Sequence, residues 1–151
     1  MKLRHLTTSA LALILMAACT DATSGTGVAP DDIAGTWTAT SLIFTSVADN
    51  TVSLDEVTDG TVVTLVLRAD GTYTFTFVSD LENENETGTY TVSGTSLTVT
   101  AVTPTPLDPE TMTISRVGDT MTLTLDDIYD FTPDDTVDEE EAATMVIVLA
   151  R

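Results

Sequence analysis

Very few side chains in this sequence can act as nucleophiles or as nitrogen and sulfur ligands for metals. The 151 residues include one histidine, His5, one cysteine, Cys19, and one lysine, Lys2. All three lie within the first 19 residues, so the rest of the chain has none. Catalytic triads, cysteine–histidine dyads, Schiff bases and typical zinc sites each need at least one of these residue types. We therefore expect a protein that is not an enzyme.

Carboxylates are the reactive groups that remain, with 24 Asp and Glu residues in the chain. No single pair stands out as a glycosidase-like pair. The densest run is DDIYDFTPDDTVDEEEAA, which could bind Ca²⁺ through clustered carboxylates. The candidate ligands are Asp126, Asp127, Asp130, Asp134 and Asp135. The run lacks the spacing of an EF-hand, and the alternative is a solvated loop. No other cofactor is indicated.

Basic side chains are scarce, with 5 Lys and Arg residues in all. After the first 19 residues only Arg68, Arg116 and Arg151 remain. Such an acidic chain is a poor partner for nucleic acid and for a broad anionic lipid surface. Its charge favours solubility, divalent cations or cationic partners.

The elements that must position these groups are β-strands. The stretch VVTLVLRADGTYTFTFV at 62–78 alternates apolar residues with threonine on both sides of Asp70-Gly71. A period of two indicates strands with one apolar face, and Asp-Gly is a strong signal for a tight hairpin turn. We predict eight strands, at approximately 36–46, 61–68, 72–79, 87–93, 96–102, 111–117, 120–126 and 143–150.

The connections between these strands alternate in length. Short turns with glycine fall at 70–71, 93–94 and 118–119, and longer connections at about 47–60, 80–86, 103–110 and 127–142. Even strand number and hairpin connections predict an all-β, eight-stranded antiparallel up-and-down barrel; a two-sheet β-sandwich is the alternative. In the barrel, all long connections lie at one end. That end then carries most of the acids, and the three arginines lie at the other.

A barrel of eight strands is either filled by its own side chains or holds one small ligand. The candidate ligand-lining residues are aromatic: Tyr73, Phe75, Phe77, Tyr90, Tyr129 and Phe131. Tyr129 and Phe131, in the last long connection, could fold over the mouth as a lid. The alternative for all six is ordinary core packing.

The N-terminus predicts an export signal. Residues 1–18 contain a basic start, an apolar run too short to span a bilayer, and small residues before Cys19. Leu15-Met16-Ala17-Ala18-Cys19 resembles the lipobox of bacterial lipoproteins. That resemblance implies cleavage before Cys19, acylation of Cys19 (palmitate among the chains) and membrane anchoring. Thr20 after the cysteine favours an outer-membrane lipoprotein, with the domain in the periplasm or at the cell surface. Residues 19–32 then form a flexible tether and residues 33–151 the barrel domain.

The sequence Gly35-Thr36-Trp37 resembles the G-x-W signature of lipocalins and their calycin relatives. ADGTYTFTF at 69–77 and GTYTVSGTSLTVT at 88–100 are similar to hairpins of bacterial lipocalin-like domains. The resemblance implies a barrel whose Trp37 closes the base against an arginine after the last strand. Arg151 matches that position, and Arg116 is its rival.

Two functions are compatible with these features. The first is a lipid-anchored, monomeric protein of the cell envelope that binds or carries a small apolar or amphipathic molecule. The second is a non-catalytic surface module whose acidic loops contact a protein partner or Ca²⁺.

Overall fold

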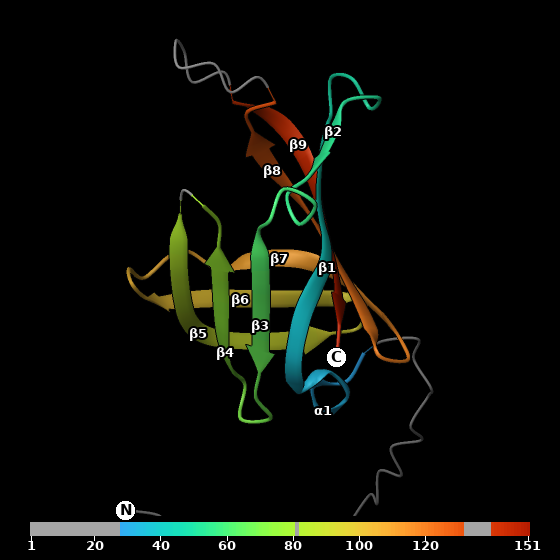
Figure 1. The fold of residues 1–151 in the computed structure, drawn as a ribbon. Coiled ribbons are helices and arrows are strands. Elements are labelled where there is room, and N and C mark those ends of the chain that lie inside the picture. Colours follow the sequence, from blue (N-terminus) through green and yellow to red (C-terminus); the bar gives the residue numbers. More distant parts are fainter. Residues whose placement is uncertain (1–27, 81, 132–139) are drawn as a thin grey trace, which may run out of the picture.

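The computed structural model describes residues 28–80, 82–131 and 140–151 (Figure 1). In this part of the chain there are one short helix and nine strands. They are α1 (Pro30–Ile33), β1 (Gly35–Ser46), β2 (Ser53–Asp55), β3 (Val62–Leu67), β4 (Thr72–Val78), β5 (Asn83–Ser93), β6 (Ser96–Thr103), β7 (Glu110–Val117), β8 (Thr120–Tyr129) and β9 (Glu141–Ala150).

The strands close into an eight-stranded antiparallel barrel. The hydrogen-bonded order runs β1-β3-β4-β5-β6-β7-β8-β9, and β9 pairs back onto β1. The predicted closed barrel is therefore confirmed, and the alternative of two open sheets is excluded. Because the sheet closes on itself, no barrel strand is left as an unpaired edge in the part of the molecule where all eight strands are hydrogen-bonded in a circle.

The alternation of residue types explains which side of each strand faces inward. On β3, Val63, Leu65 and Leu67 are buried, while the threonine and valine residues between them are partly or fully exposed. On β8, Met121, Leu123 and Leu125 are buried in the same alternating way. Except for Leu125, these inward side chains belong to one core cluster that also contains Tyr73, Tyr90 and Trp37.

Three details differ from the predicted strands. Strand β5 begins at Asn83 rather than at 87, because residues 83–86 pair fully with β4. Strand β8 continues to Tyr129, paired with β9. The connection at 47–60 contains the short strand β2, which pairs only with β1. The connection after β4 is consequently short, and the strict alternation of long and short connections does not hold there.

The strands β1 and β8 each change partners along their length. Residues Gly35–Thr38 of β1 pair with β3, whereas Ile43–Thr45 pair with β2. Strand β8 pairs with β7 only up to Thr124 and then with β9 alone. The upper halves of β1, β8 and β9, together with β2, therefore form a ribbon that rises above the barrel (Figure 1). We call residues 43–46, 53–55, 125–129 and 141–145 the extension.

The opposite end is closed by α1 and by Trp37. Ile33 and Trp37 are fully buried there. Pro30 begins the helix, where a missing N–H is tolerated, and Asp32 accepts a hydrogen bond from the Ala29 N–H at 3.4 Å. The structure thus shows an ordered segment at 28–32, in the last part of the expected flexible tether. Packing explains the difference, since Val28 contacts the core and its N–H donates to the Gly94 carbonyl at 3.0 Å.

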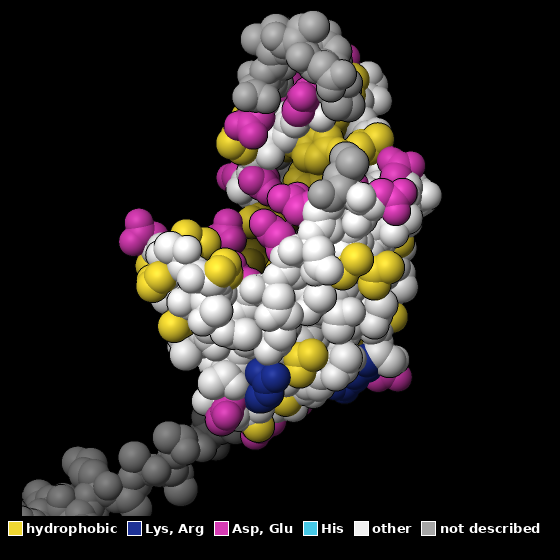
Figure 2. Space-filling view, turned by 60° about the vertical axis from the view of Figure 1, so that its left-hand side comes forward, with side chains coloured by type: hydrophobic (Ala, Val, Ile, Leu, Met, Phe, Trp, Pro, Cys, Tyr) yellow, Lys and Arg dark blue, Asp and Glu magenta, His cyan; other side chains and the backbone are white. Residues whose placement is uncertain are grey.

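Charge is sorted between the two ends. Arg68 and Arg116 lie beside the tight turns that follow β3 and β7, and Arg151 follows β9 at the closed end. The space-filling view shows basic side chains near the closed end and acidic side chains around the hollow at the other end (Figure 2). All three described arginines thus lie at the closed end, as predicted, although a few carboxylates lie beside them, such as Asp119 next to Arg151.

Candidate ligand-binding site

A cavity of about 390 Å³ occupies the open end of the barrel. This volume lies in the range of small-molecule sites. Figure 2 shows its mouth as a hollow with apolar side chains inside and acidic side chains around it. The apolar lining comes from seven of the eight barrel strands: Leu42, Phe44, Val63, Leu65, Phe75, Phe77, Leu97, Val99, Met112, Leu123, Leu125, Met145, Ile147 and Leu149.

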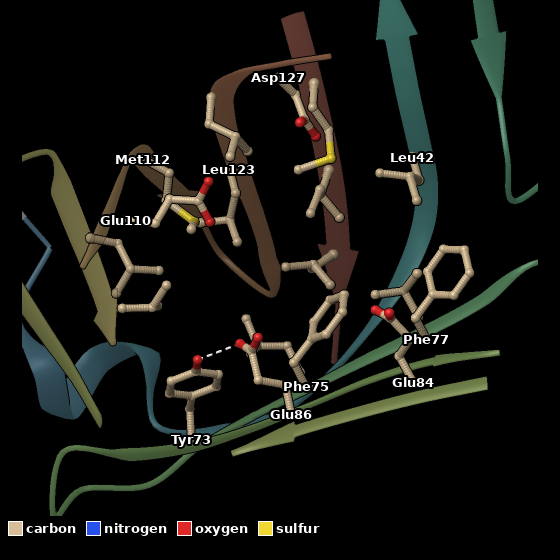
Figure 3. A pocket seen from close by; sticks show the side chains of 18 of the residues that line it. Leu42, Tyr73, Phe75, Phe77, Glu84, Glu86, Glu110, Met112, Leu123 and Asp127 are labelled. Carbon is tan, nitrogen blue, oxygen red and sulfur yellow. Dashed lines mark hydrogen bonds between the residues drawn. The ribbon is translucent and has the colours of Figure 1, made fainter. Parts of the chain in front are cut away.

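The polar lining consists of one tyrosine and five carboxylates: Tyr73, Glu82, Glu84, Glu86, Glu110 and Asp127. The close-up shows Glu84 and Glu86 on one side of the cavity and Glu110 and Asp127 across it (Figure 3). No Lys or Arg is among the described residues that line the cavity. The site is therefore an apolar chamber below a ring of negative charge.

Strand β5 places two of these carboxylates inside by simple alternation. Glu86 is the Cα partner of Phe75, and Glu84 is the Cα partner of Phe77. Because cross-strand partners point to the same face of a sheet, both glutamates share the inner face with the phenylalanines. Sequence reasoning missed these two residues as part of the lining, since it assigned 80–86 to a solvated connection.

Tyr73 is held between Glu86 and Gly88. The Tyr73 hydroxyl donates a short hydrogen bond to Glu86 Oε1 (Figure 3). Burial raises the pKa of Tyr73, and the hydrogen bond to the Glu86 carboxylate and its charge raise it further. A Cβ at Gly88 would lie 2.8 Å from Tyr73 Cε1, so the ring rests directly on the glycine backbone. The phenol therefore stays protonated and acts as a fixed donor on the cavity wall.

Glu110 faces two other carboxylates across the mouth. Its pKa is raised, first by burial of its carboxyl group and then by the negative charges of Asp127 and Glu86. The second cause reflects a cavity wall that carries several acids and no described Lys or Arg. Proton uptake or a bound cation would relieve this repulsion.

Three aromatic rings pack on the concave side of the extension. Phe44 and Tyr129 stack with ring centroids 4.2 Å apart, and Phe131 meets Tyr129 edge to face at 5.0 Å. Strand β9 lies between β1 and β8, and its residue on this face is the small, buried Ala143. A small side chain here leaves room for the stacked rings of Phe44 and Tyr129. The Tyr129 hydroxyl donates a short hydrogen bond to Glu56, and burial followed by that bond raises the pKa of Tyr129.

The six aromatic residues predicted to line a ligand site separate into three groups. Tyr73, Phe75 and Phe77 line the cavity. Tyr90 lies outside the lining, because its hydroxyl donates to the Arg68 carbonyl at 2.7 Å near the closed end. Tyr129 and Phe131 belong to the aromatic cluster of the extension and do not line the cavity. Phe44, which lines the cavity and also contacts Tyr129, was not singled out by the sequence pattern.

The closed end contains the residues of the G-x-W motif. The Arg151 guanidinium carbon lies 4.7 Å from the centroid of the Trp37 ring, and the Trp37 indole N–H donates to the Ile33 carbonyl at 2.7 Å. Gly35 has a φ of +149°, and a Cβ there would lie 3.4 Å from Arg151 Nη1. Of the two arginines considered for contact with Trp37, the structure places Arg151 on the ring. Arg116 points inward from β7, and its Nε is buried without a hydrogen-bond partner.

The five aspartates proposed as Ca²⁺ ligands do not form one described site. Asp126 is exposed, whereas its neighbour Asp127 lines the cavity, as expected for adjacent residues of a strand. Asp134 and Asp135 lie outside the described residues. In the described part of the chain no three His, Cys, Asp or Glu side chains are grouped closely enough to hold a metal ion.

The described residues include no helix with the length and apolar character needed to cross a bilayer. The predicted signal segment and Cys19 lie outside those residues.

Comparison with known proteins identifies the family. Neither the search of curated proteins nor the search of solved structures gave a match. The model of the lipocalin-like domain family matches residues 33–123, which is more than half of the chain. The match begins at the buried Ile33 of the closed end and continues through Leu123 of β8. With its closed eight-stranded antiparallel barrel and its family match, the chain belongs to the lipocalin-like domain family.

Proposed function

We propose that this protein is a lipid-anchored lipocalin-like protein of the cell envelope that binds or carries a small apolar or amphipathic molecule. The observation that carries the proposal is the cavity of about 390 Å³ that opens at one end of the barrel. An eight-stranded barrel can be filled by its own side chains, and this one retains space for a ligand. The mechanism is sequestration or carriage, without covalent chemistry.

The position of the chain's first described residues supports an orientation on the membrane. Val28 is bonded to Gly94 at the closed end, on the side of the barrel opposite the cavity mouth. If Cys19 carries the lipid, the nine residues from Cys19 to Val28 span at most about 30 Å. The closed end would then face the membrane, and the mouth would face away from it, toward the periplasm or the outside of the cell.

Ligand binding is tested by filling the cavity. Val99 lines the cavity on β6, and Val99→Trp adds an indole to it. Val102, on the same strand, is 55% exposed, so Val102→Trp is the matched control on the outside. Titration of an environment-sensitive apolar dye should show saturable 1:1 binding by the wild-type protein and by Val102→Trp. Binding to Val99→Trp should weaken at least tenfold.

Two results would contradict the proposal. Absence of saturable binding by any neutral, cationic or anionic amphiphile would remove the basis for carriage. Equal binding by Val99→Trp and by the wild-type protein would place the dye outside the barrel.

Lipid anchoring is tested separately in a bacterial host that acylates lipoproteins. The wild-type protein should enter the detergent phase in a detergent phase-partition experiment, and Cys19→Ala should stay in the aqueous phase. Native mass spectrometry of the Cys19→Ala protein would also show the mass of any ligand retained from the host. If the wild-type protein stayed in the aqueous phase, the proposed lipid anchor would be refuted, and the proposal that the cavity binds a ligand would still stand.

A further inference from the structure

We propose that the cavity selects a cationic amphiphile, with the apolar tail in the barrel and an ammonium group among the carboxylates of β5, β7 and β8. This inference rests on the proposed function and specifies the chemical class of its ligand.

The first argument is the uncompensated charge of the mouth. Five carboxylate side chains line the cavity, and no described lining residue is basic. The three described arginines lie at the closed end. Arg68 donates to Thr74, Arg151 contacts Trp37 and Asp119, and Arg116 lies on the inward side of β7 beside the turn at Gly118. The ring of carboxylates therefore lacks a counter-charge from the described protein. A ligand that brings a positive charge supplies one.

The second argument is the direction of the carboxylates. Glu84 and Glu86 occupy inward positions of β5, opposite Phe77 and Phe75. Asp127 is also on the inner face, since it pairs with the buried Ala143. If these acids only served to keep the loops at this end solvated, their side chains would point into the solvent and not into the cavity. Glu86 and Asp127 are partly buried, and the carboxyl group of Glu110 has a raised pKa from burial and from the charges of Asp127 and Glu86, so negative charge at this site is unfavourable in the empty protein.

The third argument concerns the shape of the cation. The carboxylates come from separate walls of the cavity (Figure 3), and acidic side chains surround its opening (Figure 2). Such an arrangement suits a bulky organic cation, which offers several faces at once. Tyr73, Phe75 and Phe77 lie on the same wall as Glu84 and Glu86, and aromatic faces attract ammonium groups by about 0.5–2 kcal/mol each.

The fourth argument concerns the tail. Apart from the carboxylates and the aromatic rings, the lining consists largely of aliphatic side chains that include Val63, Leu65 and Leu97. Tyr73 is the one uncharged polar side chain among the described lining residues, and its hydroxyl already donates to Glu86, so the remaining contacts offered to a ligand are mostly apolar. Burial of apolar area contributes about 25 cal/mol per Å², which an alkyl or aromatic tail can supply. A small hydrophilic amine would leave this surface unused.

The experiment compares three probes with the same decyl chain and different head groups. They are decyltrimethylammonium, decyl maltoside and decyl sulfate, titrated by calorimetry below their micelle concentrations, at low ionic strength and at 150 mM salt. The cationic probe should bind at least tenfold more tightly than the neutral probe at low salt. The anionic probe should bind more weakly than the neutral one. Added salt should reduce the difference.

A pair of variants separates local charge from net charge. Glu110→Gln/Asp127→Asn removes two carboxylates from the mouth, and Asp31→Asn/Asp126→Asn removes two exposed ones outside the cavity. The first variant should lose most of the preference for the cation while keeping its affinity for decyl maltoside. The second should bind all three probes as the wild-type protein does.

The outcomes distinguish this inference from the proposed function. Equal binding of the cationic and neutral probes would overturn the inference and leave ligand carriage standing. Equal loss of cation preference in both double variants would also overturn it, because net charge would then explain the effect. Failure of all three probes to bind would overturn the proposed function and this inference with it.

Discussion

The Gly88→Ala substitution tests how closely the wall of the cavity is packed. An ideal Cβ at this position would lie 2.1 Å from the Thr100 carbonyl oxygen and 2.8 Å from Tyr73 Cε1. Both distances are far below a normal van der Waals contact. The carbonyl belongs to the backbone of β6, which cannot move away without opening its ladder with β5.

The expected loss in the free energy of unfolding follows from these two contacts. Overpacking a well-packed interior costs about 1–3 kcal/mol, and each backbone hydrogen bond lost from the ladder adds about 1 kcal/mol. We expect Gly88→Ala to lower the free energy of unfolding by about 3 kcal/mol. For a domain of this size that corresponds to a Tm lower by about 10 °C. Displacement of the Tyr73 ring should also separate its hydroxyl from Glu86 and weaken amphiphile binding.

The assay is thermal and urea unfolding followed by circular dichroism. Gly118→Ala is the control, because Gly118 has a φ of +61° and nothing lies within 4 Å of its added Cβ. It should lose only about 1 kcal/mol, the cost of the left-handed backbone conformation. Measured in a Tyr73→Ala background, Gly88→Ala should cost less than in the wild type but not nothing, since the contact with Thr100 remains. A Gly88→Ala protein within 0.5 kcal/mol of the wild type would refute this account of the wall.

Three further predictions concern the closed end and the mouth. Trp37→Phe should lower the free energy of unfolding by about 3 kcal/mol in urea titration, because it leaves the buried Ile33 carbonyl without its donor and reduces core packing. Arg151→Gln should cost about 1 kcal/mol in the same assay, mainly from its contact with Trp37, since the ion pair with Asp119 is exposed. Glu110→Gln should stabilise the protein near pH 7 and have little effect below about pH 4. The raised pKa of Glu110 means that its contribution to stability is present when it is protonated and is lost as the pH rises through the folded-state pKa, so unfolding measured from pH 3 to 8 checks the sign.

The barrel could be predicted because the sequence patterns that indicate it involve residues close together in the chain. Alternation on β3 and β4 and the turn at Asp70-Gly71 each involve neighbouring residues, and the structure pairs these two strands as one hairpin. Tight glycine turns recur at Gly94 and Gly118, both with positive φ. Local pattern also predicted that the arginines and the carboxylates would lie at opposite ends, since that follows from hairpin connectivity.

The start of β5 was missed because the polar and charged composition of this segment indicated a loop more strongly than its alternating residue pattern indicated a strand. Residues 83–86 read Asn-Glu-Asn-Glu, a composition typical of a solvated loop. Their pairing with β4 shows that alternation was present, with polar residues on both faces. Only the register with Phe75 and Phe77 reveals that the glutamates face a cavity. That register depends on a partner strand and not on the segment itself.

The extension was missed for a different reason. It requires β1 to exchange β3 for β2 halfway along its length, and no local pattern marks such a change of partner. Its aromatic cluster joins Phe44 to Tyr129, and the Tyr129 hydroxyl reaches Glu56 across 73 positions of sequence. Contacts of this separation are properties of the closed fold.

Strands β1 and β5 each contribute to the packed core at the closed end and to the cavity lining at the mouth. Strand β5 places Tyr90 in the buried core near the closed end, and Glu86 and Glu84 at the mouth. Strand β1 likewise runs from the fully buried Trp37 to Phe44 at the cavity. Stability should therefore depend mainly on the closed end, where side chains are fully packed and hydrogen-bonded. The mouth carries the repelling carboxylates, which weaken the empty protein, and these are the groups that a cationic ligand would stabilise.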